Sequence, residues 1–457
     1  GLKIGPWSRS VQHLSVRGQT MIAHRSERGD VGLTLRYSPT DMQERPDSMS
    51  PAPTGTPPSA ERQAPEPLTG LALGGGGARA AYQVGVLRYL ARAHPEVSFP
   101  VVTGVSAGAI NAALLASHHG SLPQAVEELT GLWSQLQISN VFRTDPWSLG
   151  RIGVRWLLRL GSGGASASPA VRGLVDTTPL RRYLIEALHP VDGHLTGIDY
   201  NLQHGRLRAV ALSTVNYTTG TSVTWVQGSE IQDWERPMRR SRQTRLTVDH
   251  VMASSALPLF FPATRIGNHW FGDGGVRLTA PLSPAVHLGA TRVLALSTRY
   301  LRTLPEGEEE LVQGYPPPAQ ILGVLMNAVF LDLLDQDAIR LERINQMLER
   351  LDPEAWMGLR PVQLLVMRPS EDLGKLAADL EPELPRSFRF LTRGLGTRET
   401  RSSDALSLIL FQHDYLRRIM DLGERDAEAR SEELRAFFAT PPSATGQSRP
   451  HPGPQSG

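Results

Sequence analysis

Two short apolar runs in the first half of the chain each lead into a glycine-containing turn and then into a helical pattern. Residues 68–73 precede four glycines and the segment ARAAYQVGVLRYLARAH, and residues 99–105 precede SAGAINAALLAS. Further strand candidates, rich in Val, Leu and Thr, lie at 207–214, 222–226, 292–297 and 362–367. Strands that alternate with helices are typical of layered α/β folds. We therefore predict a three-layer α/β/α fold with a mainly parallel sheet.

The composition changes at both ends of the chain. Residues 1–67 have scattered charge, no sustained periodicity and a final stretch rich in Pro, Ser and Ala, and residues 441–457 are similar. Such segments cannot bury enough apolar surface to fold, so we expect both termini to be disordered. We predict a main α/β domain at 68–300. Residues 301–440, mainly helical by their i, i+3, i+4 spacing with one further strand, are predicted to form an extension packed on it.

Several classes of protein are excluded or disfavoured by composition. The 457 residues include no cysteine, which excludes disulfides, thiolate metal sites and a cysteine nucleophile and fits a reducing compartment. A net charge of +2 does not indicate a nucleic-acid-binding protein. No uninterrupted apolar run reaches the ~18 residues of a spanning helix, because the longest candidate, 321–334, contains Asn327 and Asp332. We therefore expect a cytoplasmic protein without a transmembrane helix.

The segment Gly104-Val105-Ser106-Ala107-Gly108 lies between a predicted strand and a predicted helix. A serine at such a sharp turn projects its hydroxyl from the edge of the sheet, and the flanking glycines allow the tight turn. The N-terminus of the following helix would favour negative charge developing beside the serine. The pentapeptide also occurs by chance, but its strand–turn–helix context favours a nucleophilic Ser106.

The run from Gly74 to Gly77, followed by Ala78 and Arg79, comes directly after the first predicted strand. Consecutive glycines leave backbone N–H groups uncovered, so that an anion can approach them. Two other interpretations remain open. The run is also compatible with a simple tight turn. In addition, its spacing fits the G-x-G-x-x-G/A fingerprint of dinucleotide sites, with Ala80 in the last position.

A single acidic residue, Asp273, stands between glycines in the segment FGDGG. Taken alone, this pattern is most often an aspartate in a β-turn. The apolar run ASSALPLFFPATRIGNHW before it, with a strand leading into the aspartate, favours a functional carboxylate instead. A carboxylate flanked by glycines is sterically free to approach another group.

The order of LALGGGGAR, GVSAGAINA, ASSALPLFFPA and GDGG over residues 68–300 resembles the patatin-like phospholipase family, and NAVFLDLLDQDAIRLERINQM resembles its bacterial cytoplasmic members. The resemblance implies a serine lipid acyl hydrolase that cleaves carboxylic esters of phospholipids or other acyl lipids, without metal or organic cofactor. It implies Ser106 as the nucleophile of a Ser-Asp dyad and Asp273 as its partner. The implied oxyanion hole consists of Gly75, Gly76, Gly77 and Arg79.

The resemblance leaves three points open. The family usually has glycine where this chain has Ala80, which matters only if that position needs a positive φ; we expect Ala80 to lie in the first turn of a helix, where alanine is tolerated. Arg79 is expected either to act at the site or to brace the loop. A Ser-His-Asp triad remains an alternative, although His250 and His287 have the apolar surroundings of core histidines and His413 lies in a helical tail.

Two segments are candidates for contact with a lipid or micelle surface. Residues 147–168 combine arginines on one helical face with two tryptophans and a glycine-rich end, a pattern that predicts a surface helix, an interfacial helix or a lid. The second segment is a basic cluster with no acidic residue among its arginines, Arg236, Arg239, Arg240, Arg242 and Arg245. A nucleotide-dependent oxidoreductase and a catalytically inactive lipid-binding relative remain the competing functions.

Overall fold

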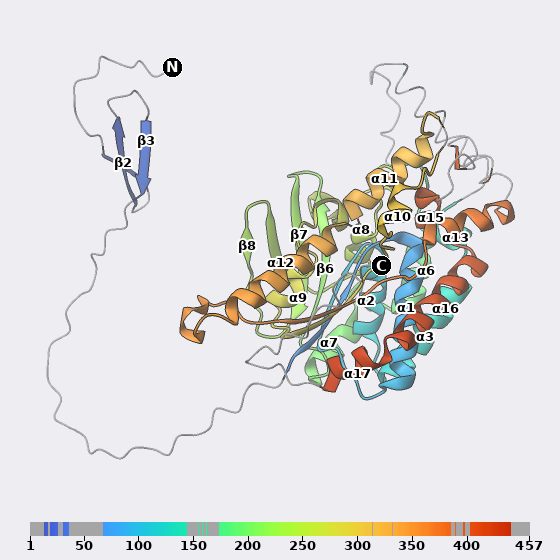
Figure 1. Cartoon of the computed structure of the whole chain (residues 1–457), viewed down its shortest axis with the longest axis horizontal. Coiled ribbons are helices and arrows are strands. Elements are labelled where there is room, and N and C mark those ends of the chain that lie inside the picture. Colours follow the sequence, from blue (N-terminus) through green and yellow to red (C-terminus); the bar gives the residue numbers. More distant parts are fainter. Residues whose placement is uncertain are drawn as a thin grey trace. The chain divides into compact units, whose positions relative to one another are not determined.

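The computed structural model describes residues 67–143, 173–312, 314–330, 332–384 and 403–439, isolated residues at 154, 158, 161, 389, 396 and 397, and three strands nearer the N-terminus. The chain divides into two compact units, residues 1–64 and 65–457 (Figure 1).

The N-terminal unit contains a small antiparallel sheet in the order β1-β2-β3, formed by β1 (His13–Val16), β2 (Gln19–Arg25) and β3 (Val31–Leu35). In this sheet His13 pairs with Ile22, and Met21 pairs with Leu35. These strands lie within residues 1–67, for which the composition predicts disorder, and that disorder stays a prediction. Short strands that follow one another closely can pair locally without the apolar content that a large core requires, so composition does not reveal them. The remainder of 1–66 and residues 440–457 lie outside the described residues.

The larger unit is built on a mixed sheet of ten strands in the order β13-β12-β4-β5-β6-β7-β9-β8, with β11 paired to β6 and β10 paired to β11. The first five strands in this order are mutually parallel. They are β13 (Gln363–Met367), β12 (Arg292–Leu296), β4 (Thr69–Leu73), β5 (Val101–Val105) and β6 (Ala209–Asn216). The others are β7 (Thr221–Gly228), β8 (Glu235–Arg236), β9 (Arg239–Gln243), β10 (Thr264–Ile266) and β11 (His269–Asp273).

Alternate residues of the central strands enter two different apolar clusters, one on each face of the sheet. In β6, Val210 and Leu212 belong to one cluster, whereas Ala209 and Ala211 belong to the other. The first face is covered by α1 (Ala81–Ala93), α2 (Ala107–Ser117), α3 (Leu122–Gln135) and α16 (His413–Ala429), and Figure 1 shows α1, α3 and α16 side by side. The second face is covered by α9 (Ser283–His287) and α12 (Leu333–Leu348). The predicted three-layer α/β fold is confirmed.

All six strand candidates correspond to observed strands, within two residues at each end. The strands β8, β9 and β10 are short and polar and were not predicted from the sequence. The remaining helices are α4 (Ile138–Val141), α6 (Thr178–Leu188), α7 (Thr196–Gln203), α8 (Val248–Ser254), α10 (Leu304–Glu308), α11 (Pro318–Phe330), α13 (Leu373–Leu380), α15 (Asp404–Ile409) and α17 (Ser431–Ala439). Short 3₁₀ turns are η1 (Gly77–Ala80), η2 (Gly274–Arg277), η3 (Pro353–Trp356) and η4 (Glu381–Glu383).

The C-terminal region completes the same structural unit. Its strand β13 is hydrogen-bonded to β12 and therefore extends the main sheet. Its helix α16 crosses α1 at two glycines: a Cβ on Gly85 would lie 1.9 Å from the carbonyl oxygen of Met420, and one on Gly423 would lie 2.2 Å from that of Tyr82. Backbones this close require glycine at both positions. Among the described residues, one helical run, Pro318–Leu348, is long and apolar enough to cross a membrane by those two criteria alone.

Candidate active site

Ser106 stands between the last residue of β5 and the first residue of α2, with a φ of 57° and a ψ of −134°. A positive φ is unfavourable for a residue with a side chain and is found where the surrounding structure imposes it. The flanking glycines make the turn possible. A Cβ on Gly104 would lie 2.5 Å from the carbonyl oxygen of Gly108, and one on Gly108 would lie 2.4 Å from that of Leu73. The predicted strand–turn–helix geometry is therefore present.

Two serines at the end of α8 hold the strained backbone of Ser106. The hydroxyl of Ser254 accepts from the Ser106 N–H at 3.1 Å and donates to the carbonyl oxygen of Ser213 in β6 at 2.7 Å. The hydroxyl of Ser255 donates to the Ser106 carbonyl oxygen at 3.1 Å. Both belong to the ASSALP segment, to which the sequence analysis assigned no separate role. The structure places them as positioning residues for the serine turn.

Replacing Ser254 with alanine is expected to lower kcat about tenfold with little change in KM, because the buried Ser106 N–H loses its acceptor and the turn relaxes. The free energy of unfolding should fall by about 1–3 kcal/mol, the usual cost of an unsatisfied buried group. Steady-state kinetics with a soluble ester and thermal denaturation would measure both effects.

Ser117→Ala is the matched control for Ser254→Ala. It also removes a buried hydroxyl, but one without a hydrogen-bond partner among the described residues. Equal kcat values for the two variants would show that Ser254 does not position Ser106.

Asp273 reaches Ser106 because β5 and β11 meet end to end along the same edge of β6. The parallel strand β5 ends with Val105 opposite Ser213, and the antiparallel strand β11 ends with Asp273 opposite Thr214. The two strands approach from opposite directions, and their C-terminal ends lie beside consecutive residues of β6. The side chains that follow these ends are thereby brought together, although they are far apart in sequence.

The carboxyl group of Asp273 is completely buried, and burial raises its pKa from 3.8 to about 7. The Ser106 hydroxyl and the Gly275 N–H lower this pKa, but by less than burial raises it. The Gly275 N–H donates to Oδ1 at 2.9 Å, whereas Oδ2 has no hydrogen-bond partner among the described residues. The serine hydroxyl is therefore near enough to affect the carboxyl group without a formed hydrogen bond, as is common in enzymes without bound substrate.

The glycine loop after β4 lies beside Ser106. A Cβ on Gly75 would be 3.0 Å from the Cβ of Ser106 and 3.6 Å from its hydroxyl oxygen. Gly76 and Gly77 have φ values of 143° and 56°. Among the described residues, no protein acceptor is bonded to the N–H groups of these three glycines. Free amides beside a serine hydroxyl are the arrangement that stabilises an oxyanion.

The N–H of Ala107, in the first turn of α2, is also without an intrahelical acceptor, because the first N–H groups of a helix have none. Ala107 and the glycine loop line the same pocket as Ser106. The sequence analysis did not single out Ala107. The signal that could have found it is its position directly after the predicted nucleophile, where the backbone N–H commonly contributes to an oxyanion hole.

Arg79 does not direct its guanidinium toward Ser106. Its Nε donates to the hydroxyl of Ser407 at 2.7 Å, and its Nη2 lies 2.6 Å from the Asp404 carboxylate, both on α15. The side chain is almost completely buried, at 3% exposure. Of the two roles considered for Arg79, these contacts favour bracing the loop over direct action at the site.

Ala80 occupies the end of η1 with a φ of −66° and is fully buried. Alanine adopts this φ without strain, so the position does not require glycine. The departure from the usual family pattern at this residue leaves the loop geometry intact.

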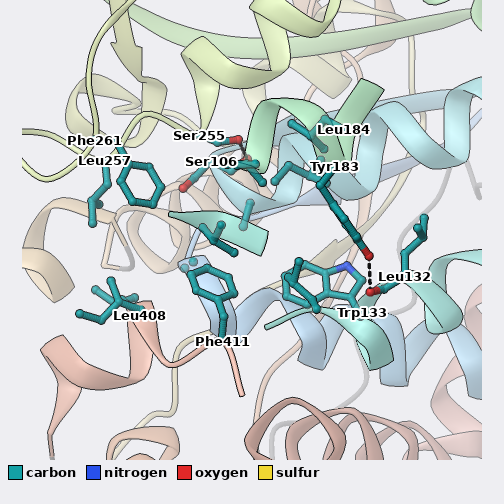
Figure 2. Close-up of a pocket in the computed structure, with 18 of the residues that line it drawn as sticks. Ser106, Leu132, Trp133, Tyr183, Leu184, Ser255, Leu257, Phe261, Leu408 and Phe411 are labelled. Atoms are coloured by element: carbon teal, nitrogen blue, oxygen red, sulfur yellow. Dashed lines mark hydrogen bonds between the residues drawn. The ribbon is translucent and has the colours of Figure 1, made fainter. Parts of the chain in front are cut away.

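The pocket around Ser106 is lined almost entirely by apolar and aromatic side chains, and Figure 2 labels eight of them beside Ser106 and Ser255. None of the lining residues carries a charge. The polar atoms of two lining aromatic residues form hydrogen bonds with other protein groups. The hydroxyl of Tyr183 donates to the carbonyl oxygen of Leu132 at 2.5 Å, and the indole N–H of Trp133 donates to the side chain of Asn111 at 2.8 Å. An apolar channel of this kind suits an acyl chain.

The histidines considered as alternative bases do not line this pocket. His250 is buried against Trp225, its Nδ1 contacts the hydroxyl of Thr247 at 2.8 Å, and burial lowers its pKa to about 4. His287 stacks on Trp234. His413 lies beside Asp414 at the exposed start of α16. These contacts agree with the interpretation of His250 and His287 as packed histidines.

Of the two segments considered for lipid contact, 147–168 lies outside the described residues except for residues 154, 158 and 161. The basic cluster falls on β8, β9 and the turn after them. Although the cluster contains no acidic residue in sequence, Arg245 forms an ion pair with Asp199 at 2.6 Å. Among the described residues, no metal-binding group of three or more His, Asp or Glu side chains is found.

Comparison with known proteins gives the following matches. The family described as patatin-like phospholipase matches residues 71–286. Among solved structures, human GIVD cytosolic phospholipase A2 in complex with methyl gamma-linolenyl fluorophosphonate is 14% identical with a TM-score of 0.38, over 81% of this chain and 59% of that one. VipD from Legionella pneumophila is 11% identical with a TM-score of 0.29, over 88% and 70%.

The type III effector ExoU of Pseudomonas aeruginosa is 15% identical with a TM-score of 0.29, over 88% of this chain and 57% of that one. The chain thus spans less than two thirds of the length of the human phospholipase and of ExoU. A comparison with curated proteins found no match. The family match includes Ser106, Asp273 and the glycine loop, and residues 71–286 are therefore similar to the patatin-like phospholipase domain.

Proposed function

We propose that this protein hydrolyses carboxylic esters of phospholipids or other acyl lipids through a Ser106–Asp273 dyad and an acyl-enzyme. The observation that carries the proposal is a strained serine that lines an uncharged, apolar pocket and stands beside a buried carboxyl group with a raised pKa. A pKa of about 7 suits a general base, because near neutral pH the group is partly ionised and still basic enough to accept a proton.

In the first step, the ionised Asp273 accepts the proton of the Ser106 hydroxyl while the oxygen attacks the ester carbonyl carbon. The N–H groups of Gly75, Gly76, Gly77 and Ala107 donate to the carbonyl oxygen as it becomes negative. The bond to the alcohol then breaks, and the alcohol leaves with the proton held by Asp273. Each preorganised donor of this type typically contributes about 10²–10³ in rate.

In the second step, water attacks the acyl-enzyme carbonyl and passes a proton to Asp273. The tetrahedral intermediate collapses to the fatty acid, and the proton returns to Ser106. Arg79 takes no part in the bond changes in this scheme. It holds the glycine loop on α15 through Asp404 and Ser407, so that the amides keep their direction.

The competing functions find less support. A dinucleotide site normally presents an acidic side chain to the ribose, and the pocket that Gly76 and Gly77 line has no charged side chain. An inactive relative would not need the strained turn at Ser106, whose φ of 57° has an energetic cost.

We propose a cytoplasmic enzyme that associates reversibly with membranes, in agreement with the cysteine-free composition.

The decisive experiment is labelling with a fluorophosphonate carrying a long alkyl chain. Attack of the Ser106 oxygen on phosphorus expels fluoride and leaves a stable adduct, so we expect the intact mass to increase by one adduct and peptide mapping to place it on Ser106. Ser106→Ala is expected to remain unlabelled and to release no fatty acid from phospholipid micelles. Labelling of the variant at the same rate would refute the proposed nucleophile.

A further inference from the structure

Helix α11 presents an unusual face to solvent. Its sequence, PAQILGVLMNAVF, contains no charged residue. Four large aliphatic side chains are 42–57% exposed, namely those of Ile321, Leu322, Val324 and Leu325. A surface helix of a soluble protein normally turns charged and polar residues outward. A contiguous exposed apolar face of this kind indicates a surface that binds a partner molecule or a membrane.

The opposite face of α11 packs directly on the active site. Gly323 lies against α15, because a Cβ at this position would be 3.1 Å from the Cβ of Asp404. Phe330, the last residue of α11, covers Gly275: a Cβ on that glycine would be 2.3 Å from the Phe330 ring. Phe330 also lines both the apolar pocket around Ser106 and a second cavity behind the glycine loop. The end of α11 therefore forms part of the wall of the pocket that contains Ser106.

A hydrogen-bonded chain joins α11 to the glycine loop. Asn327 donates to Oδ2 of Asp404 at 2.8 Å, and Oδ1 of the same carboxylate accepts from Arg79 at 2.6 Å. Arg79 belongs to η1, which continues the loop. The position of α11 and the position of the loop amides are thus linked through one carboxylate.

The dimensions of α11 favour an interfacial position over a spanning one. Its 13 residues extend about 20 Å at 1.5 Å per residue, shorter than the roughly 30 Å of a bilayer hydrocarbon core. The next helix, α12, carries several charged side chains and does not continue the apolar face. A further exposed apolar residue, Leu259 at 76%, stands in the loop between Leu257 and Phe261, which line the Ser106 pocket.

We propose that the outer face of α11 docks on a lipid surface and thereby places the apolar pocket against the acyl chains of the substrate. This inference rests on the proposed function for its substrate, since a lipid ester must leave a membrane or micelle to enter the pocket. The helix α11 ends in Phe330, which lines the apolar pocket. The lipid that supplies the substrate to this pocket would therefore also cover the outer face of α11. A partner that covered α11 permanently would stand beside the route to Ser106.

The test uses the full chain with Val324 and Leu325 both changed to Gln. Both side chains are more than half exposed, so the loss of their burial in lipid predicts at least a tenfold loss of binding to vesicles of zwitterionic phosphatidylcholine. Flotation would measure binding, and fatty acid release from the same vesicles would measure hydrolysis. Hydrolysis of a water-soluble short-chain ester should change less than twofold.

Met347→Gln is the matched control, because it removes a 64%-exposed apolar side chain from the distant end of α12. It should bind vesicles like the unchanged protein. Equal vesicle binding by the Val324/Leu325 variant would overturn the proposal, as would an equal loss of soluble-ester hydrolysis, which indicates a structural role for α11. A dimer that the double substitution converts to a monomer would show that a second copy covers this face and would also overturn it.

Failure of the proposed function would be distinguishable from failure of docking. Flotation needs no chemistry, so Ser106→Ala should bind vesicles fully even though it cannot hydrolyse an ester. Binding without any hydrolysis by the unchanged protein would refute the enzyme while leaving the docking face supported.

Discussion

Asp273→Asn is expected to lower kcat/KM for a soluble ester by about 10²–10⁴-fold, the contribution typical of a positioned general base. Asparagine has nearly the same shape, and its side-chain oxygen can still accept from the Gly275 N–H, now at 2.9 Å. It cannot accept the serine proton at neutral pH. Initial rates with a soluble ester, normalised by the folded fraction, measure the effect. Activity within a few-fold of the unchanged enzyme would exclude the Ser-Asp dyad.

The pH dependence provides an internal check on the same residue. Asp273 must be ionised to act, and its pKa is raised to about 7. The value of kcat/KM in the unchanged enzyme should therefore decline about tenfold per pH unit below 7 and reach a plateau above it. The residual activity of Asp273→Asn should lack this inflection. An inflection near pH 4 in the unchanged enzyme would mean that the carboxyl group is not desolvated in solution.

As the pH rises toward 7, the free energy of unfolding should decrease while the activity increases. Because the folded-state pKa of Asp273 is above its unfolded value, its contribution favours folding below pH 3.8 and is lost as the pH rises to about 7. The loss is on the order of 4 kcal/mol, since each pKa unit corresponds to about 1.4 kcal/mol. The Asn variant lacks this titration. Its free energy of unfolding relative to the unchanged protein should therefore increase from pH 4 to pH 8.

Gly75→Ala is expected to lower kcat/KM by about 10²-fold, comparable to the loss of one oxyanion donor. Gly75 is not among the glycines with positive φ, so its backbone can accommodate alanine. The added methyl group would lie 3.0 Å from the Cβ of Ser106, closer than carbon atoms normally approach. The loop or the serine must shift, and the amides would no longer be directed at the developing oxyanion. Single-turnover acylation with a soluble ester would measure this step.

Gly131→Ala is the matched control for Gly75→Ala. It lies within α3, where an added Cβ meets no atom within 4 Å, and alanine there should stabilise the helix by up to about 1 kcal/mol without changing the rate. Full activity of Gly75→Ala would show that the loop amides do not need their present position. Unfolding of that variant, in contrast to the control, would place its effect in packing rather than catalysis.

Much of the fold could be predicted because the positions of its strands and helices follow from local sequence patterns. The apolar runs at 68–73 and 99–105 are strands because their Val and Leu side chains pack on both faces of the sheet, and the periodic Leu, Ile and Met residues of α16 form a helix against α1. The strands β8 and β9 could not be predicted in this way. Their sequences are dominated by arginine, and they form only because β7 offers an edge with which to pair.

Some residues of the candidate site could likewise be predicted from the sequence, whereas others could not. The sequence indicated Ser106, Asp273 and the glycine loop, each from a short motif. It did not indicate that Ser254 holds the serine backbone or that Arg79 reaches Asp404, 325 positions away in the chain. Such contacts join segments whose separation in sequence carries no information about their distance in space.

By itself, the sequence indicated the layered α/β class, the serine turn and the resemblance to patatin-like phospholipases, because glycine spacing and apolar periodicity are properties of neighbouring residues. Only the tertiary structure decided that β5 and β11 end beside consecutive residues of β6, and that α11, whose outer face is apolar, packs with Phe330 against Gly275. The physical reason is that a serine becomes a nucleophile, and a carboxyl group becomes a base near pH 7, only when packing of distant segments removes water from both.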